Sequence, residues 1–147
     1  MHAQGEPHEF RRGPIHVGTD VISVNEISHS LERFGERYVR RIYTPREAAY
    51  CRSAVGRGVA ERFAARFAAK EAVLKALRLE DPSIDWRSIE VLRHASGRCD
   101  VVLHGEAAAL AARHGIDTLS LSMSHETDCA IAVAIAQSTE RATNREL

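Results

Sequence analysis

Cysteine pairs and zinc-binding patterns are absent from this sequence. Its 147 residues include three cysteines, Cys51, Cys99 and Cys129, and no two of them form a CxxC pair. An odd number of cysteines without that spacing argues against a disulfide framework and against a zinc ribbon. The eight histidines are scattered without an HExxH pattern, so a histidine-based zinc site has no support. A reducing, cytoplasmic setting is the simplest expectation.

Long hydrophobic runs, excess charge and nucleotide-binding loops are missing as well. The longest apolar run, Cys129–Ala136, is far too short to cross a bilayer and fits a buried strand. The first 14 residues lack the apolar core of a secretory signal. Twenty basic and twenty acidic side chains cancel, which argues against a nucleic-acid binder held by bulk charge. Neither a Walker A loop nor a GxGxxG motif is present. We therefore expect neither a membrane nor a nucleic acid as a partner of this protein.

The composition that remains is that of a globular protein. The chain is 44% hydrophobic and 27% charged, and its length suits one domain with a real core. We expect an α+β fold, with an antiparallel sheet packed on a long helix, over residues 14–137. Residues 1–13 are expected to form a flexible arm and residues 138–147 a polar tail.

Local patterns predict where the strands and helices lie. In the first strand, Ile15, Val17 and Val21 share one face, as in a half-buried strand. Capping boxes at Ser23–Glu26 and Thr44–Glu47 open two helices. The expected strands are Ile15–Val21, Ile89–Arg93, Cys99–Leu103, Leu119–Met123 and Cys129–Ala136, and the expected helices run from Ser23 to Gly35, from Thr44 to about Ala54, from Val59 to about Leu79 and from Gly105 to His114.

Lysine is scarce although basic residues are common. Of the 20 basic residues 18 are arginines, and the two lysines, Lys70 and Lys75, share the long helix. An arginine-biased genome explains this, and so does a need for two compact ammonium groups, for example against phosphate. At about 100° per residue Lys70 falls in the middle of the apolar stripe, while Glu71 and Lys75 follow its edge. A Glu71–Lys75 helix pair, with lysine stems reaching water, is the structural alternative.

Asp20 and Glu71 are the candidate metal ligands. Asp20 follows Gly18 on the less apolar face of the first strand, where a turn-forming aspartate is the simpler interpretation taken alone. Beside Glu71 it would supply two hard oxygen ligands. Magnesium is typically held by one or two carboxylates plus waters and substrate phosphates. The set, with lysines nearby, suits metal-assisted transfer on a phosphate ester.

His125 and Cys129 close the list of candidates. His125 lies at the tip of the turn SHETD, where histidine is commonly only a turn residue, but its ring also suits donation to a phosphate oxygen. Cys129 begins the last apolar strand and is expected in the core.

Five segments in order make the chain resemble a known family. They are GTDVISVNEI, TPREAAYC, ARFAAKEAVLKAL, GRCDVVLHGEAAALA and LSLSMSHETDCAIAVAIA, from about Val17 to Ala136. Together they resemble the holo-acyl-carrier-protein synthases, the small 4′-phosphopantetheinyl transferases. The RFAAKEAxxKA pattern is highly specific, and the GxD motif and the serine-histidine turn support it at their positions.

The resemblance implies the reaction and its metal. Such an enzyme moves 4′-phosphopantetheine from coenzyme A to a serine of an apo acyl carrier protein and releases adenosine 3′,5′-bisphosphate. Asp20 matches the GxD aspartate and Glu71 the KEA glutamate, which together would hold Mg²⁺ against the pyrophosphate. Lys75 matches the lysine that neutralises the pyrophosphate in the transition state. Either Glu71 or a metal-bound water would accept the serine proton.

The resemblance also implies coenzyme-binding residues and an assembly. His125 matches the histidine near the coenzyme A phosphates. Arg66 and Lys70 fall on helix positions that flank the site, as coenzyme-binding or positioning residues. The family is typically a homotrimer with active sites at subunit interfaces.

Departures from the family pattern concern the carrier and local geometry. Glu26 stands where the family usually has an arginine that docks the acidic carrier, which predicts weaker binding of an ordinary acidic carrier. This departure favours a dedicated carrier protein of the fatty-acid or polyketide type as the partner. Arg78 replaces a glycine and Cys99 a proline, and the arm is longer than most. Four nearby arginines could compensate for the negative charge of Glu26 in binding the carrier: Arg33, Arg37, Arg40 and Arg41.

Two other functions stay open at the level of sequence. One is a different magnesium-dependent phosphate-ester enzyme that uses Asp20 and Glu71 on another donor. The other is a degenerate homologue that binds a carrier without catalysis. Coenzyme A binding that depends on Arg66 and His125 separates the first from the synthase, and carrier binding without turnover identifies the second.

Overall fold

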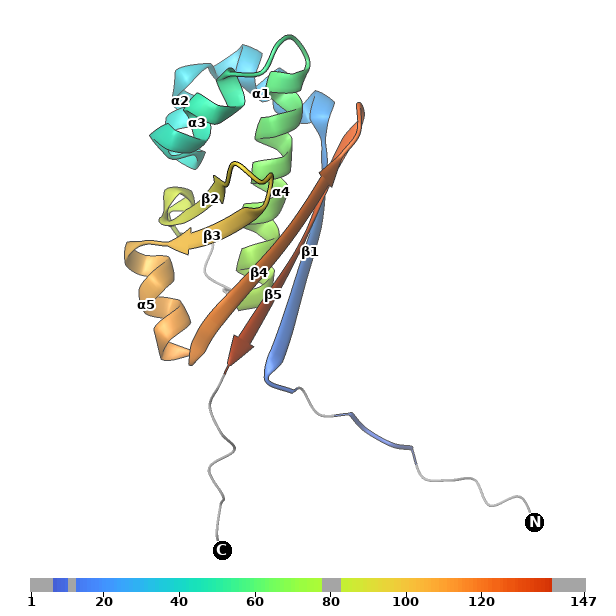
Figure 1. The fold of residues 1–147 in the computed structure, drawn as a ribbon, viewed down its shortest axis with the longest axis vertical. Helices are drawn as coiled ribbons and strands as arrows, with labels where there is room; N and C mark the ends of the chain where they lie inside the picture. Colours follow the sequence, from blue (N-terminus) through green and yellow to red (C-terminus); the bar gives the residue numbers. More distant parts are fainter. Residues whose placement is uncertain (1–6, 11–12, 78–82, 139–147) are drawn as a thin grey trace, which may run out of the picture.

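A long central helix organises the molecule. The computed structural model describes residues 7–10, 13–77 and 83–138. On one side of this helix, α4 (Gly58–Leu77), lies a three-stranded sheet, and a two-stranded hairpin with short helices lies on the other (Figure 1). In chain order the elements are β1 (Ile15–Ser23), α1 (Val24–Phe34), α2 (Glu36–Ile42), α3 (Pro45–Arg52), α4 (Gly58–Leu77), η1 (Trp86–Ser88), β2 (Ile89–Arg93), β3 (Cys99–Leu103), α5 (Gly105–Arg113), β4 (Ile116–His125) and β5 (Cys129–Ser138).

The predicted α+β architecture is confirmed, with the strands divided between two sheets. The larger sheet has the order β1-β5-β4 and is antiparallel throughout, and the smaller is the β2-β3 hairpin. Small residues face each other where α4 packs on the larger sheet. Alanines at every second position of β5 are buried against alanines of α4, so the helix backbone lies close to the sheet. These alanines are Ala130, Ala132, Ala134 and Ala136 in β5 and Ala68, Ala69, Ala72 and Ala76 in α4.

Gly18 sets the distance between β1 and α4. A Cβ atom at Gly18 would lie 1.9 Å from the carbonyl oxygen of Ala72 and 2.6 Å from the amide nitrogen of Ala76. Because both contacts are with helix backbone, any side chain here forces β1 away from α4. Asp20, two residues further along the strand, is on the same face. The glycine thus brings the Asp20 carboxyl group to the flank of α4.

The apolar face of β1 points away from the helix. Ile15, Val17 and Val21 are 57–62% exposed, which corrects the expectation of a strand whose apolar side is buried. The less apolar side, with Gly18, packs on α4 instead. The partly exposed β5 residues Ile131, Val133 and Ile135 continue the same surface. We call the side of the larger sheet that carries these six residues the outer face.

The helices around α4 show what local signals predict. Ser23 and Thr44 are both N-caps, as expected, and the Thr44–Glu47 capping box is confirmed. At Ser23 only one half of the expected box is present, the bond that its side chain accepts from the Glu26 amide. Helix α2 was not predicted, because Gly35, with φ at 54°, ends α1 and the next helix begins directly after it. Cys129 is exposed, so its expected place in the core is wrong.

Some predictions fall on residues outside the described ranges. Most of the predicted arm (1–13), nearly all of the tail (138–147) and Arg78 lie there. Within the residues that are described, no helix is both long and apolar enough to cross a membrane.

Candidate functional site

Two carboxylates and a lysine meet where β1 crosses the second half of α4. Lys75 donates hydrogen bonds from its ammonium group to Asp20 Oδ1 at 3.0 Å and to the Thr19 carbonyl oxygen at 2.9 Å. Desolvation, with a further contribution from the charge of Asp20, raises the pKa of Glu71, and Lys75 opposes the rise. The structure therefore brings Asp20, Glu71 and Lys75 together, and we call these three residues the carboxylate cluster. The only ion pair that it records for Lys75 within the described chain is with Asp20, not with Glu71.

The donor set of this cluster fits a magnesium ion. Asp20 Oδ2 is buried and has no hydrogen-bond partner among the described residues. A buried anionic oxygen without a partner is costly, and a cation would satisfy it. No group of three or more histidine, cysteine or acidic side chains suited to a metal occurs in the described part of the chain. Two carboxylates, completed by water and phosphate oxygens, are the arrangement that Mg²⁺ accepts.

A second polar cluster lies beside the first half of α4 and is strongly basic. The guanidinium carbons of Arg66 and Arg62 lie 4.1 and 4.3 Å from the centroid of the Tyr50 ring, and that of Arg93 lies 5.5 Å away. A pocket of about 210 Å³ is lined by these residues together with His125. We call Arg62, Arg66 and Arg93 the arginine cluster. Its positive charge and its concave shape suit a phosphate group.

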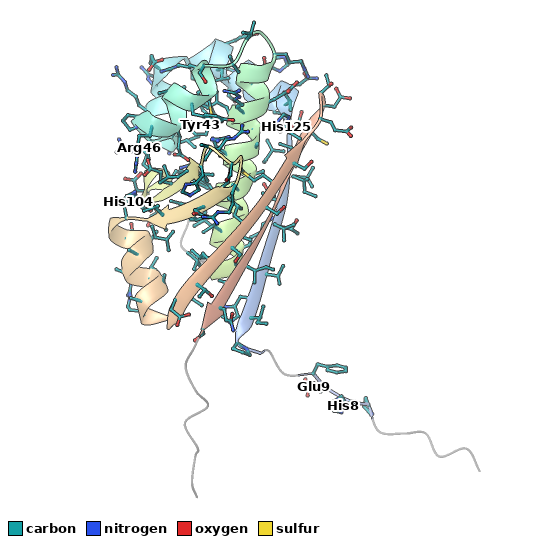
Figure 2. All side chains as sticks on the ribbon, viewed as in Figure 1. His8, Glu9, Tyr43, Arg46, His104 and His125 are labelled. Atoms are coloured by element: carbon teal, nitrogen blue, oxygen red, sulfur yellow. The ribbon has the colours of Figure 1, made fainter. Side chains whose placement is uncertain are left out.

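His125 approaches this pocket from the end of β4. Figure 2 shows it beside the first turns of α4, and its Nδ1 atom is 3.4 Å from Glu61 Oε2. The turn that carries His125 is held in place by Arg57, whose guanidinium donates to the Thr127 carbonyl oxygen at 2.7 Å. Glu61 of α4 therefore faces the His125 ring, and Arg57, just before α4, holds the backbone of the turn that follows His125.

The two clusters lie on opposite sides of α4. Counted from Arg66, Glu71 and Lys75 are rotated by about 140° and 180° around the helix axis. Asp20 is on β1 and His125 is on β4. Because β5 lies between these two strands, the strands are roughly 9.5 Å apart. Within one copy of the chain, the carboxylate cluster and the arginine cluster therefore face different directions.

Lys70 belongs to neither cluster. Its ammonium group is fully buried and bonds Glu47 Oε1 at 2.8 Å, the Trp86 carbonyl oxygen at 3.0 Å and the Ile89 carbonyl oxygen. Burial lowers the pKa of Lys70, and the charge of Glu47 opposes this. Because every donor of the ammonium group is used within the chain, these contacts favour the positioning role over the coenzyme-binding role that was expected for Lys70. The alternative of a lysine stem reaching water does not apply to Lys70.

A second buried carboxylate ties the hairpin to α3. Glu90 accepts hydrogen bonds from Thr44 Oγ1 and from Arg46 Nη2, the latter at 2.6 Å, and lies 3.1 Å from His104 Nε2. Arg46 and His104 are labelled beside the hairpin in Figure 2. Desolvation raises the pKa of Glu90, but the three hydrogen bonds outweigh it and lower the pKa to about 2. Together with the Glu47–Lys70 pair, this network fixes β2 against α3 and α4.

Sequence patterns did not single out Tyr50, Glu61, Arg62 or Arg93. Tyr50 and Arg93 lie on α3 and β2, and nothing local shows that these elements meet. The spacing of Arg62 and Arg66, four residues apart on one helix face, was the only available signal.

Comparison with known proteins gives the family. Residues 16–134 match the model of the 4′-phosphopantetheinyl transferase superfamily. The chain belongs to this superfamily. The transferases most like it include the holo-[acyl-carrier-protein] synthase of Koribacter versatilis, 43% identical over 82% of this chain and 96% of the relative. The synthase of Desulforudis audaxviator is 45% identical over 82% of this chain and 90% of the relative.

Solved transferase structures share the fold. The Chronobacterium ammoniagenes ACPS-CoA complex covers 84% of this chain and 97% of its own, with 30% identity and a TM-score of 0.73. The Helicobacter pylori holo-[acyl-carrier-protein] synthase in complex with coenzyme A covers 82% and 99%, with 26% identity and a TM-score of 0.71. The fold that the sequence predicts is therefore the fold of this family.

Proposed function

We propose that this protein transfers 4′-phosphopantetheine from coenzyme A to a serine of an apo acyl carrier protein, with release of adenosine 3′,5′-bisphosphate. The observation that carries the proposal is the buried Asp20 Oδ2 atom, which has no hydrogen-bond partner in the described part of the chain and lies beside Glu71 and Lys75, at the positions of the family's motifs. Support comes from the relatives named holo-[acyl-carrier-protein] synthase and from the related structures that hold coenzyme A.

The carboxylate cluster would provide the positive charge that this chemistry needs, through the Mg²⁺ ion that it would hold and through Lys75. Serine attack on a pyrophosphate is opposed by negative charge on the phosphates. Asp20 and Glu71 would hold Mg²⁺, which offsets that charge. Lys75 is 53% exposed on its side chain and keeps an ammonium group at the same place, where it would donate to phosphate oxygens.

The arginine cluster and His125 would hold the coenzyme. Arg66 is 3% exposed and its Nε atom has no hydrogen-bond partner among the described residues, so a phosphate oxygen would satisfy it. His125 lines the same pocket. Its Nδ1 atom is the one near Glu61, so its Nε2 atom would be the one to contact a phosphate oxygen. These contacts bind and orient coenzyme A relative to the carboxylate cluster.

A homotrimer would unite the two clusters. They face different directions in one copy, although one coenzyme A molecule needs both. The outer face offers an apolar surface of the kind that marks an interface, formed by alternate residues of β1 and β5. A closed ring of copies would cover this face and place the arginine cluster of one copy opposite the carboxylate cluster of the next.

We assign the catalytic domain to residues 14–137, and the enzyme to the cytoplasm.

The carrier is expected to differ from an ordinary acidic one. Glu26 is exposed in the first turn of α1, where it places a negative charge on the helix that we propose as the docking surface. A carrier helix with fewer acidic residues would avoid the repulsion.

Intact-protein mass spectrometry tests the proposed function. A panel of apo acyl carrier proteins is incubated with the protein, coenzyme A and Mg²⁺, with chelator in matched samples. We expect a mass gain of one phosphopantetheine that is lost with chelator, and a faster reaction on the less acidic carriers. No gain on any carrier would contradict the activity, and equal rates across the panel would contradict the dedicated carrier alone.

A further inference from the structure

Tyr50 is the residue through which the three arginines contact one another. Arg66 and Arg62 stack on its ring, with Arg93 at a longer distance. Its hydroxyl oxygen accepts a hydrogen bond from Arg93 Nη1, and its carbonyl oxygen accepts one from Arg62 Nη1 at 2.8 Å. A single residue of α3 therefore fixes two arginines of α4 and one of β2, through its ring, its hydroxyl group and its backbone.

Among the residues that the structure describes, the arginine cluster has no negative partner of its own. Over residues 13–77 and 83–138, the recorded ion pairs join none of Arg62, Arg66 and Arg93 to a carboxylate. Three like charges at one place repel one another unless other contacts or an anion hold them there. Arg66 is almost fully buried with an unsatisfied Nε atom. The cluster is thus kept together by Tyr50 and left available to an anion.

We propose that Tyr50 is a positioning residue that holds Arg62, Arg66 and Arg93 in the arrangement that binds the phosphate groups of coenzyme A. The inference rests on the proposed function. Arg62 Nη1 and Arg93 Nη1 donate to Tyr50 itself. Stacking on the ring faces leaves the edges of the guanidinium groups open, so their other N–H donors can serve an anion in the pocket. Arginines that are ordered before binding lose less side-chain entropy when the phosphate arrives.

The test is calorimetric binding of two probes, inorganic pyrophosphate and coenzyme A, to three folded variants. Tyr50→Leu removes the aromatic ring and the hydroxyl group, and we expect it to weaken both affinities on the order of tenfold. Tyr50→Phe keeps the ring and loses only the bond to Arg93, so affinity should stay within about threefold of the wild type. Tyr38→Leu is the matched control, because Tyr38 is a partly buried tyrosine that contacts Tyr43.

Kinetics separate positioning from a general loss of structure. In Tyr50→Leu the KM for coenzyme A should rise by about the same factor as the dissociation constant, with kcat nearly unchanged. Unchanged affinity in Tyr50→Leu, or an equal loss in Tyr38→Leu, overturns the inference. If the wild type binds pyrophosphate in a Tyr50-dependent way but transfers nothing, the proposed function fails and the role of Tyr50 in anion binding stands. A wild type that binds neither probe contradicts both.

Discussion

Replacing Asp20 or Glu71 by alanine is expected to reduce phosphopantetheine transfer by about three orders of magnitude or more while the fold is kept. Each substitution removes one of two carboxylates that would hold Mg²⁺, and the charge offset by a metal ion is worth several kcal/mol in such reactions. The free energy of unfolding should change little. The negative charges of Glu71 and Asp20 repel each other, and neither residue packs in the core. Single-turnover transfer and urea denaturation measure the two quantities.

A surface acid provides the control for this experiment. Glu36 is an exposed carboxylate of α2 that pairs with Arg40 and Arg52. Glu36→Gln should keep both the transfer rate and the stability within small factors. Near-normal transfer by both Asp20→Ala and Glu71→Ala would reject the metal site.

Breaking the Glu47–Lys70 pair is expected to cost about 3–5 kcal/mol of unfolding free energy, because a buried charge is left without its partner. Both side chains are fully buried, and Glu47 also accepts hydrogen bonds from the amides of Thr44 and Val91. Lys70→Met keeps the length and the apolar stem of the side chain, so the measured loss in urea denaturation reports the charge and its hydrogen bonds.

The other lysine of the helix is the matched control. Lys75→Met removes an exposed ion pair with Asp20, which is worth about 1 kcal/mol or less. We expect Lys75→Met to fold normally and to transfer poorly, and Lys70→Met to lose stability. The double variant Glu47→Gln, Lys70→Met should be more stable than the sum of the two single losses predicts. Equal stability of the two lysine variants would contradict the distinct roles.

Local signals predicted most of the fold. The bounds of β2 and β3 agree with the expected strands, and the Thr44–Glu47 capping box begins α3, because turn chemistry and capping act within a few residues. The faces of β1 were separated correctly by alternation. Which face would contact α4 depended on Gly18 and the backbone of Ala72, and no pattern within β1 contains that information.

The candidate site, too, was predictable from the sequence only in part. Motif positions identified Asp20, Glu71 and Lys75, which the structure brings together. The position of Lys70 in the apolar stripe correctly indicated burial, but its partner Glu47 is 23 residues away on another helix, so the ion pair was not predictable from helix spacing. Of the arginine cluster, the motif named Arg66, but Arg62 and Arg93 were missed. Elements α3, α4 and β2 contribute to the cluster, and only their packing brings them together.

Restoration of activity in mixed oligomers tests the central claim, that two clusters on opposite sides of α4 act on one coenzyme A molecule. Glu71→Ala and Arg66→Ala are each expected to be inactive alone. Co-expressed, with a different tag on each chain, they are expected to regain roughly a quarter of the wild-type transfer rate, because in a randomly mixed ring one interface in four combines an intact Glu71 with an intact Arg66. Co-expression of Glu71→Ala with Asp20→Ala, which damage the same cluster, should restore nothing. Activity no higher than the sum of the separate variants would contradict the shared site.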